Sequence, residues 1–322
     1  MRLDAFLVAR FPSSTRALVR DAIARASILL CGKPAEKGMR VRAGDEIAIK
    51  SLLEAADNRA APDPAVADAI ASRIVYDDGT LLAIDKPAGM AVHPLSPLET
   101  GTLANGVVAL RPEFAVVANE PLAAGAVHRI DTGTSGLVVF AANNFVYAAM
   151  RTLFAERAVL KKYLALAQGA VARPGAIACE LAHAPHLDHC RMVEFASLSA
   201  GERSRSRALY AETRFRPIAR IGADTLLEVE IETGVTHQIR AQLALAGHPI
   251  VGDTLYGAAP LPGGGFRLHS LSAAFSHPST GAFVTISTPP PPWAEEDYPA
   301  NLSRSNAQKP GKGRIGAGAA AS

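Results

Sequence analysis

A hairpin signal places the strongest constraint on the fold of this chain. Within IVYDDGTLLAI, two apolar runs flank Asp77-Asp78-Gly79, and such a turn between apolar runs predicts two antiparallel strands. Alternating patterns predict further strands in KKYLALAQG and LLEVEIETG, whereas helical spacing predicts helices in TLANGVVALR, VYAAMRTLFAERAV and THQIRAQLALAG. Because predicted strands outnumber predicted helices, we expect an α+β fold with a largely antiparallel mixed sheet flanked by helices.

The first 50 residues are expected to form a small α+β domain of their own. The segment SSTRALVRDAIARA predicts a helix that is capped by Ser13 or Ser14. Four of its side chains are expected to share one helical face: Ala17, Leu18, Ala22 and Ile23. Short strands are predicted in ASILLCGKPA and in VRAGDEIAIK, the second with Ile47 and Ile49 on one face.

Composition divides the rest of the chain. Residues 51–72 are rich in Ala, Asp and Pro, which predicts a linker, and the large α+β domain is expected at residues 73–300. The basic, low-complexity tail at residues 301–322 is expected to be disordered. There is no run of about 18 apolar residues and no secretory signal pattern. The three cysteines do not make a disulfide framework, so a cytoplasmic protein is expected.

Charge is distributed unevenly along the chain. Residues 1–50 contain ten Lys/Arg and five Asp/Glu. The last 22 residues contain four Lys/Arg and no Asp/Glu, and the residues between contain 19 Lys/Arg and 25 Asp/Glu. Basic ends around an acidic middle favour a polyanionic partner, although a solvated basic surface is the simpler interpretation. Three arginines at helical spacings are candidates for phosphate contacts: Arg16, Arg20 and Arg25.

The segment HRIDTGTSGLVVF, residues 128–140, contains the triplet Asp131-Thr132-Gly133 that aspartic proteases use. Those enzymes need two carboxylates that share a proton, and this chain has no second copy of the triplet. A serine-hydrolase elbow also fails, because Ser135 is followed directly by Gly136. Asp131 is therefore either a turn residue or the catalyst of another reaction.

A stretch rich in cysteine and histidine is a weak candidate for a zinc site. Its members are Cys179, His183, His186, His189 and Cys190. No two of these cysteines are two to four residues apart, as most structural zinc sites require. An exposed polar loop is the favoured interpretation, and no metal is expected.

At this point the chain resembles the RluA-type pseudouridine synthases. VHRIDTGTSGLVVFA is similar to their His-Arg-Leu-Asp-x-x-Thr-Ser-Gly motif, with Ile130 in place of Leu. Four more segments resemble blocks of that family in the same order: IVYDDGTLLAIDKPAGMAVHP, LFAERAVLKKYLALAQG, ETGVTHQIRAQLALAGHPIVGDTLYG and LHSLSAAFSHPSTG. Residues 1–50 resemble the S-four-like RNA-binding domain that family members often carry, so the resemblance covers about residues 2–290.

The resemblance has three departures. Val235 stands where Arg is usual, which removes a possible phosphate contact. Ala241-Gln242 stands where Val-His is usual, and we interpret both as packing positions. The loop at residues 180–207 matches poorly and is interpreted as an insertion that affects specificity.

The resemblance implies that the protein isomerises uridine to pseudouridine in structured RNA. This reaction has no redox step and no phosphate transfer, so no cofactor is expected. The resemblance implies that Asp131 is the essential carboxylate, acting as nucleophile or as base at the sugar. It implies that Arg240 is the partner of Asp131 and that Tyr163 stacks on the base or hydrogen-bonds to it.

Other residues are implied to handle the RNA or to support the site. Arg129 is the implied base-flipping residue, with His128 and Lys161 as further RNA-side candidates. The supporting candidates are Thr134, His237 and Gln238. Large-subunit ribosomal RNA is the preferred substrate and tRNA is the alternative, and the protein is expected to be a monomer. A non-catalytic RNA-binding or ribosome-assembly protein is the competing hypothesis.

Overall fold

The structure, a computed structural model, describes residues 1–12, 14–52, 59–117, 120, 122–184 and 191–299. Internal contacts divide the chain into two units, one of residues 1–67 and 93–125 and one of residues 68–92 and 126 onward. The tail predicted to be disordered, residues 301–322, lies outside the described residues.

Two helices and three short strands make up the N-terminal part. Helices α1 (Leu3–Arg10) and α2 (Arg16–Ala24) pack against an antiparallel sheet in the order β2 (Lys33–Pro34), β1 (Ile28–Leu30) and β3 (Ile47–Ile49). The predicted face of β3 is confirmed, because Ile47 and Ile49 are half-buried while Ala48 is exposed.

Two details of helix α2 differ from the prediction. Its N-cap is Thr15, whose side chain accepts a hydrogen bond from the Leu18 amide at 3.3 Å, so Ser14 is not the cap, and Ser13 lies outside the described residues. The buried face of the helix consists of Leu18, Val19, Ala22 and Ile23, so Val19 takes the place predicted for the exposed Ala17. The 3.6-residue period places the core-facing pair one position further along.

The segment predicted to be a linker contains regular structure. Helix α3 (Pro64–Ala71) lies within residues 51–72, and residues 53–58 lie outside the described residues. Helix α4 (Leu103–Leu110) forms where helical spacing predicted it, behind a capping box of Thr102 and Asn105, and the short helix η2 (Pro112–Val116) follows. The domain boundaries remain a prediction.

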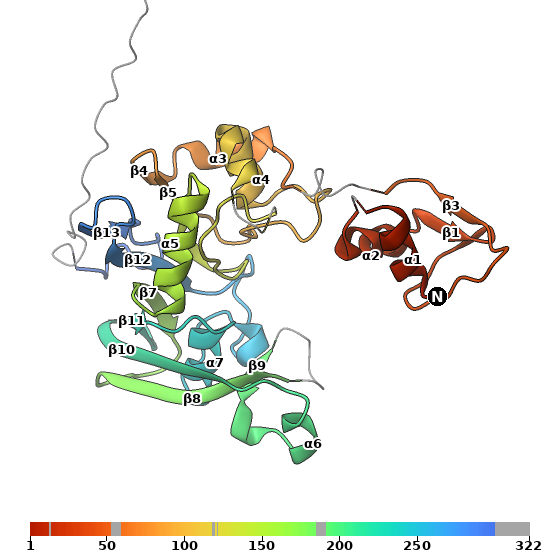
Figure 1. Ribbon diagram of the computed structural model, residues 1–322. Coiled ribbons are helices and arrows are strands. Elements are labelled where there is room, and N and C mark those ends of the chain that lie inside the picture. The colour runs from red at the N-terminus through yellow and green to blue at the C-terminus, as the bar shows by residue number, and fades with distance from the viewer. Residues whose placement is uncertain (13, 53–58, 118–119, 121, 185–190, 300–322) are drawn as a thin grey trace, which may run out of the picture. The chain divides into compact units, whose positions relative to one another are not determined.

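A ten-stranded sheet dominates the second unit (Figure 1). Its strand order is β4 (Ile74–Asp77), β5 (Leu81–Lys86), β6 (Ser135–Ala141), β12 (Leu268–Ser276), β7 (Leu160–Ala167), β11 (Asp224–Ile231), β10 (Leu209–Ile221), β8 (Gly175–His183) and β9 (Met192–Glu194), with β13 (Phe283–Ser287) beside β12. Among the described strands, β6 and β12 are the one parallel pair, so the predicted α+β fold with a largely antiparallel sheet is confirmed. The predicted hairpin is β4–β5.

Two helices of this unit cover parts of the sheet. Helix α5 (Asn144–Ala155) packs on β6, and helix α7 (Gln238–Leu245) lies against β8, β9 and β10 (Figure 1). The remaining elements are short: η3 (Phe195–Ser197), α6 (Ala200–Arg203) and η4 (Thr254–Tyr256). Strand β6 is buried from Gly136 to Ala141 because it lies inside the sheet, which explains its apolar sequence.

Candidate active site

The loop that carries Asp131 is held by the turn after strand β5. The buried Lys86 ammonium donates to the Thr132 carbonyl at 3.2 Å and to the Met90 carbonyl at 2.6 Å. The Gly89 amide donates to the same Thr132 carbonyl at 2.8 Å. Burial lowers the pKa of Lys86 to about 7. The turn Lys86-Pro87-Ala88-Gly89 therefore fixes the backbone next to Asp131.

Asp131 pairs with Arg240, which lies 109 residues away in the sequence. The Arg240 Nη1 donates to Asp131 Oδ2 at 2.9 Å, and Asp131 is half-buried while Arg240 is buried. The Thr134 amide donates to the Asp131 carbonyl at 3.0 Å and closes the turn. The structure thus brings together the two residues expected to form the reactive pair.

A second carboxylate holds the other edge of the guanidinium. Asp253, only 1% exposed, accepts hydrogen bonds from Arg240 Nε at 2.7 Å and from Nη2 at 2.9 Å. Such two-point contact fixes the plane of the guanidinium as well as its position. Asp253 was not among the predicted site residues, although it lies in the family-like segment GHPIVGDTLYG.

Aromatic rings enclose Arg240. Its guanidinium carbon lies 5.2 Å from the centre of the Tyr256 ring and 4.4 Å from the centre of the Phe266 ring. Gly133, in the Asp131 loop, lies against Phe266, because a Cβ there would come within 2.6 Å of the ring. These rings shield the guanidinium of Arg240 from water and add cation–π attraction, while the Asp131 carboxylate stays half-buried.

His237 links the helix start to the same centre. Its Nε2 lies 3.8 Å from Asp131 Oδ2, and its Nδ1 lies 3.1 Å from the Tyr256 hydroxyl. The residue adopts a left-handed conformation, with φ of 52°, as the N-cap of α7. Burial lowers the pKa of the His237 imidazole, although the nearby Asp131 opposes the shift. His237 thus supports the Asp131–Arg240 pair from the side.

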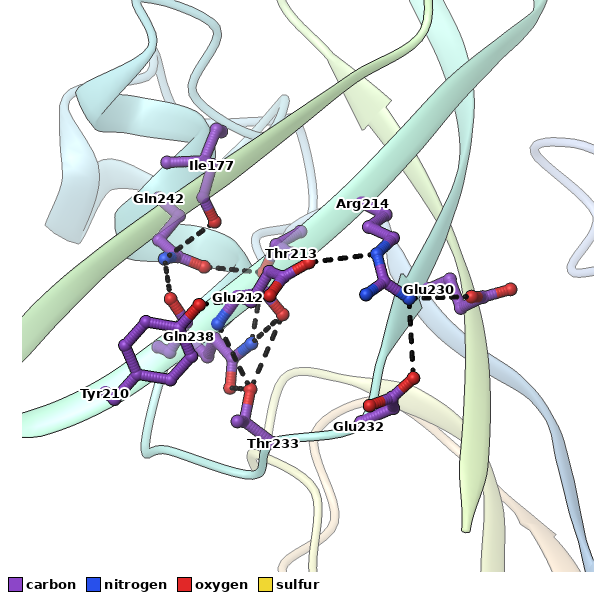
Figure 2. A network of polar contacts seen from close by, with 11 residues as sticks. Ile177, Tyr210, Glu212, Thr213, Arg214, Glu230, Glu232, Thr233, Gln238 and Gln242 are labelled. Carbon is purple, nitrogen blue, oxygen red and sulfur yellow. Dashed lines mark hydrogen bonds and ion pairs between the residues drawn. The ribbon is translucent and has the colours of Figure 1, made fainter. Parts of the chain in front are cut away.

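Two buried glutamines anchor helix α7 to strand β10 (Figure 2). Gln238 donates to the Glu212 carbonyl at 2.9 Å, and its side-chain oxygen accepts from the Thr233 hydroxyl at 2.9 Å. Gln242 accepts from the Thr213 hydroxyl at 2.6 Å and donates to backbone carbonyls of β8 and β10. Gln242 is fully buried, as expected of a packing position, and the structure adds that its amide is hydrogen-bonded. A buried amide needs polar partners, and the strand backbones provide them.

Tyr163 and Lys161 lie on one face of strand β7, and both are buried. Burial raises the pKa of the Tyr163 hydroxyl to about 12, and the nearby Asp131 carboxylate also raises it. The Lys161 ammonium donates to the carbonyls of Glu232 and Thr233 at 3.1 Å and 2.8 Å. Burial lowers the pKa of Lys161 to about 8. Tyr163 thus keeps its proton at neutral pH, whereas Lys161 secures the end of strand β11.

The two residues before Ile130 differ in their surroundings. Arg129 is exposed next to Asp131. His128 accepts a hydrogen bond from the Val139 amide at 3.1 Å and stacks on Phe154, with ring centres 5.1 Å apart. Burial lowers the pKa of His128 to about 3, so its imidazole is neutral. These contacts favour a supporting position for His128 and leave Arg129 available to a ligand.

The N-terminal arginines belong to the other unit, which is described by itself. Arg16 and Arg20 are exposed on helix α2. Arg25 follows the helix and pairs with Asp21 at 2.7 Å. Arg16 and Arg20 are one helical turn apart and form a basic edge, while the charge of Arg25 is partly compensated.

The candidate zinc ligands are only partly within view, because His186, His189 and Cys190 lie outside the described residues. Across the ranges that the structure describes, no group of three or more His, Cys, Asp or Glu side chains is arranged to hold a metal ion. No described helix is both long and apolar enough to cross a membrane.

Comparison with known proteins agrees with this geometry. The family model described as RNA pseudouridylate synthase matches residues 80–245, and the S4 domain model matches residues 1–47. The chain is 32% identical to ribosomal large subunit pseudouridine synthase D of Neisseria meningitidis serogroup A, over 90% of this chain and 76% of that protein. It is 34% identical to the protein of the same name from Xanthomonas campestris, over 90% of this chain and 86% of that protein.

A solved structure shares the fold. The human RNA pseudouridylate synthase domain containing 4 has a TM-score of 0.55 and 22% identity, covering 71% of this chain and 92% of that chain. The family model spans the Asp131 loop, strand β7 and the Arg240 helix, which are the elements that build the site. This chain therefore belongs to the RNA pseudouridylate synthase family and is an RNA pseudouridine synthase with an S4 domain at its N-terminus.

Proposed function

We propose that this protein converts specific uridines of large-subunit ribosomal RNA to pseudouridine. Two relatives named for the large ribosomal subunit each align over 90% of this chain. The observation that carries the chemical part of the proposal is the contact between Asp131 and Arg240, 2.9 Å long and backed by the buried Asp253. This arrangement presents one aligned carboxylate in a largely water-excluded site.

Asp131 supplies the carboxylate that the reaction needs. Pseudouridine formation breaks the bond between uracil and ribose, turns the base and rejoins it through carbon. A carboxylate at the sugar either attacks the anomeric carbon or removes a proton, as carboxylates do in glycosidases. Arg240 holds this carboxylate in one orientation, and pre-set geometry lowers the barrier because no reorganisation is needed during reaction.

Tyr163 faces the base. Its hydroxyl keeps its proton at neutral pH because burial raises its pKa to about 12. It can therefore stack on uracil or donate a hydrogen bond to it. Thr134, His237 and Gln238 support the loop and helix that carry Asp131 and Arg240.

Arg129 is the proposed base-flipping residue. It is exposed beside Asp131, so its side chain can enter the gap that the extruded uridine leaves. Extrusion costs a few kcal/mol, which a side chain in the gap partly offsets. His128 and Lys161 support this region through the backbone contacts described above.

We propose that residues 1–50 bind RNA through Arg16 and Arg20, with Arg25 as a weaker contributor. In this division, residues 51–72 connect to a catalytic domain at residues 73–300, and residues 301–322 form a disordered basic tail. We further propose that the protein acts as a monomer in the cytoplasm, with tRNA as the alternative substrate.

A pseudouridine map tests the function. Total RNA from cells with and without the gene is treated with carbodiimide and read by primer extension across ribosomal RNA and tRNA. We expect stops in large-subunit ribosomal RNA to vanish on deletion and to return with the wild-type gene but not with Asp131→Asn. Stops that change only in tRNA would move the substrate to tRNA. Full restoration by Asp131→Asn would refute the catalytic role of the carboxylate.

The competing hypothesis of a non-catalytic RNA-binding protein is separated by binding. Purified Asp131→Asn is expected to bind ribosomal RNA as the wild type does while forming no pseudouridine. If the deletion changes no stop in any RNA, yet its growth defect is rescued by Asp131→Asn, the non-catalytic hypothesis replaces this proposal.

A further inference from the structure

Arg191 lies beside the active site, and no acidic side chain of the described residues forms an ion pair with it. Its guanidinium carbon is 5.6 Å from the centre of the Tyr256 ring, the ring that also lies against Arg240. The hydroxyl of Tyr256 contacts His237, which in turn lies 3.8 Å from Asp131. Arg191 is thus connected to the reactive carboxylate through two side chains.

The backbone around Arg191 is fixed, whereas its side-chain Nε finds no partner among the described residues. The Ala184 amide donates to the Arg191 carbonyl at 3.1 Å, and the Met192 amide donates to the Tyr256 hydroxyl at 2.9 Å. The Nε of Arg191 is buried and has no hydrogen-bond partner within the described part of the chain. A buried donor without an acceptor is costly, so its presence in a folded protein points to a missing partner.

Other arginines of this unit show what a compensated charge looks like. Arg214 is held by Glu212, Glu230 and Glu232 on the sheet (Figure 2). Arg240 is neutralised from two sides by Asp131 and Asp253. No carboxylate of the described residues pairs with Arg191, so its guanidinium is free to take an anion from a ligand.

We propose that Arg191 binds a phosphate of the RNA chain next to the target uridine. This inference rests on the proposed function, because RNA is the ligand that brings an anion to this site. A guanidinium matches phosphate by two parallel hydrogen bonds. Arg240 is already neutralised by two carboxylates, which take hydrogen bonds from its Nε, Nη1 and Nη2, so Arg191 is the better match for a phosphate. Arg191 therefore sets which backbone position enters the pocket, while Asp131 acts on the sugar.

The contact is tested by a double-mutant cycle in which one change is made in the protein and the other in the RNA. The substrate is a synthetic RNA fragment around the uridine identified by the pseudouridine map, with one uncharged methylphosphonate placed at each linkage within two nucleotides of that uridine. We expect Arg191→Gln to lower kcat/KM about 10- to 100-fold, the range for a lost hydrogen bond to a charged group. At one linkage, methylphosphonate should lower wild-type kcat/KM similarly but change that of Arg191→Gln less than about twofold.

Controls separate this contact from general effects. Arg173→Gln removes an exposed arginine on the connection between β7 and β8 and should keep wild-type activity and sensitivity to methylphosphonate. Arg191→Lys keeps the charge and should retain part of the sensitivity, which addresses folding defects of the glutamine variant.

The outcomes are distinct. The phosphate contact is overturned if, at every linkage, methylphosphonate lowers kcat/KM by the same factor in Arg191→Gln as in the wild type. It is also overturned if Arg191→Gln has the kcat/KM of the wild type. If deletion of the gene changes no stop in the pseudouridine map, the proposed function fails and the phosphate contact fails with it. If the wild type forms pseudouridine but the two reductions of kcat/KM are independent at every linkage, only the phosphate contact is overturned.

Discussion

Replacement of Asp253 by Asn is expected to impair catalysis through Arg240. Asp253 accepts two hydrogen bonds, from Arg240 Nε at 2.7 Å and from Nη2 at 2.9 Å, and it is only 1% exposed. Asparagine has the same shape but keeps only one acceptor and turns an amide N–H toward the other donor. A hydrogen bond to a charged group contributes about 1.5–3 kcal/mol, so kcat should fall about 10- to 100-fold.

The assay is single-turnover pseudouridine formation with enzyme in excess, accompanied by urea unfolding. RNA affinity should change less than about twofold, because Asp253 is buried behind Arg240. Glu228→Gln is the matched control, since Glu228 is also a buried carboxylate and accepts from Arg216 at 2.9 Å. It should lose stability while keeping kcat. An unchanged kcat in Asp253→Asn would refute the idea that Asp253 orients Arg240, provided that Arg240→Gln is inactive.

Three further predictions concern the site and its frame. Tyr163→Phe should lower kcat at least about tenfold while filter binding of RNA is unchanged, and an equal loss of binding would argue against a role at the base. Gly136→Ala should destabilise the fold by about 3 kcal/mol or more in thermal unfolding, because φ is 106° and a Cβ would collide with the Ser270 backbone. Gly201→Ala is the control, because a Cβ there meets open space, and it should not destabilise the fold. Burial lowers the pKa of His269 to about 4, so between pH 6.5 and 4 the unfolded chain binds a proton that the folded chain does not. The free energy of unfolding should therefore decrease as the pH is lowered through this range, by up to about 1.4 kcal/mol per pH unit. Urea titrations should show a smaller pH dependence for His269→Gln, and an equal pH dependence in both proteins would contradict the prediction.

Local patterns predicted most of the fold. The β4–β5 hairpin, strand β7, strand β11 and helix α7 all formed where alternation, turn residues or helical spacing placed them. These signals depend on neighbouring residues, so a sequence displays them directly. The cap of helix α2 was wrong by one residue because Ser14 and Thr15 are equally good caps by composition.

The features of the site that the sequence did not reveal are contacts between side chains that lie far apart in the chain. Asp253 and Lys86 were not predicted as site residues, because the sequence does not show that one fixes Arg240 and the other the Asp131 loop. Gln242 was expected to pack and is buried, and only the structure shows that it also bonds to two strands that come before it in the chain. Only burial turns such polar residues into organising contacts, since an exposed amide or carboxylate would bond to water.

The sequence by itself determined the fold class, the order of the main elements and the family, because periodicity and motif order are properties of the chain. It also named Asp131 and Arg240 as partners through the family resemblance. Tertiary structure decided how the guanidinium is aimed, which lysine fixes the loop and that the Nε of Arg191 finds no partner among the described residues. The reason is that each of these depends on distances between segments far apart in the chain, and such distances exist only after the sheet has assembled.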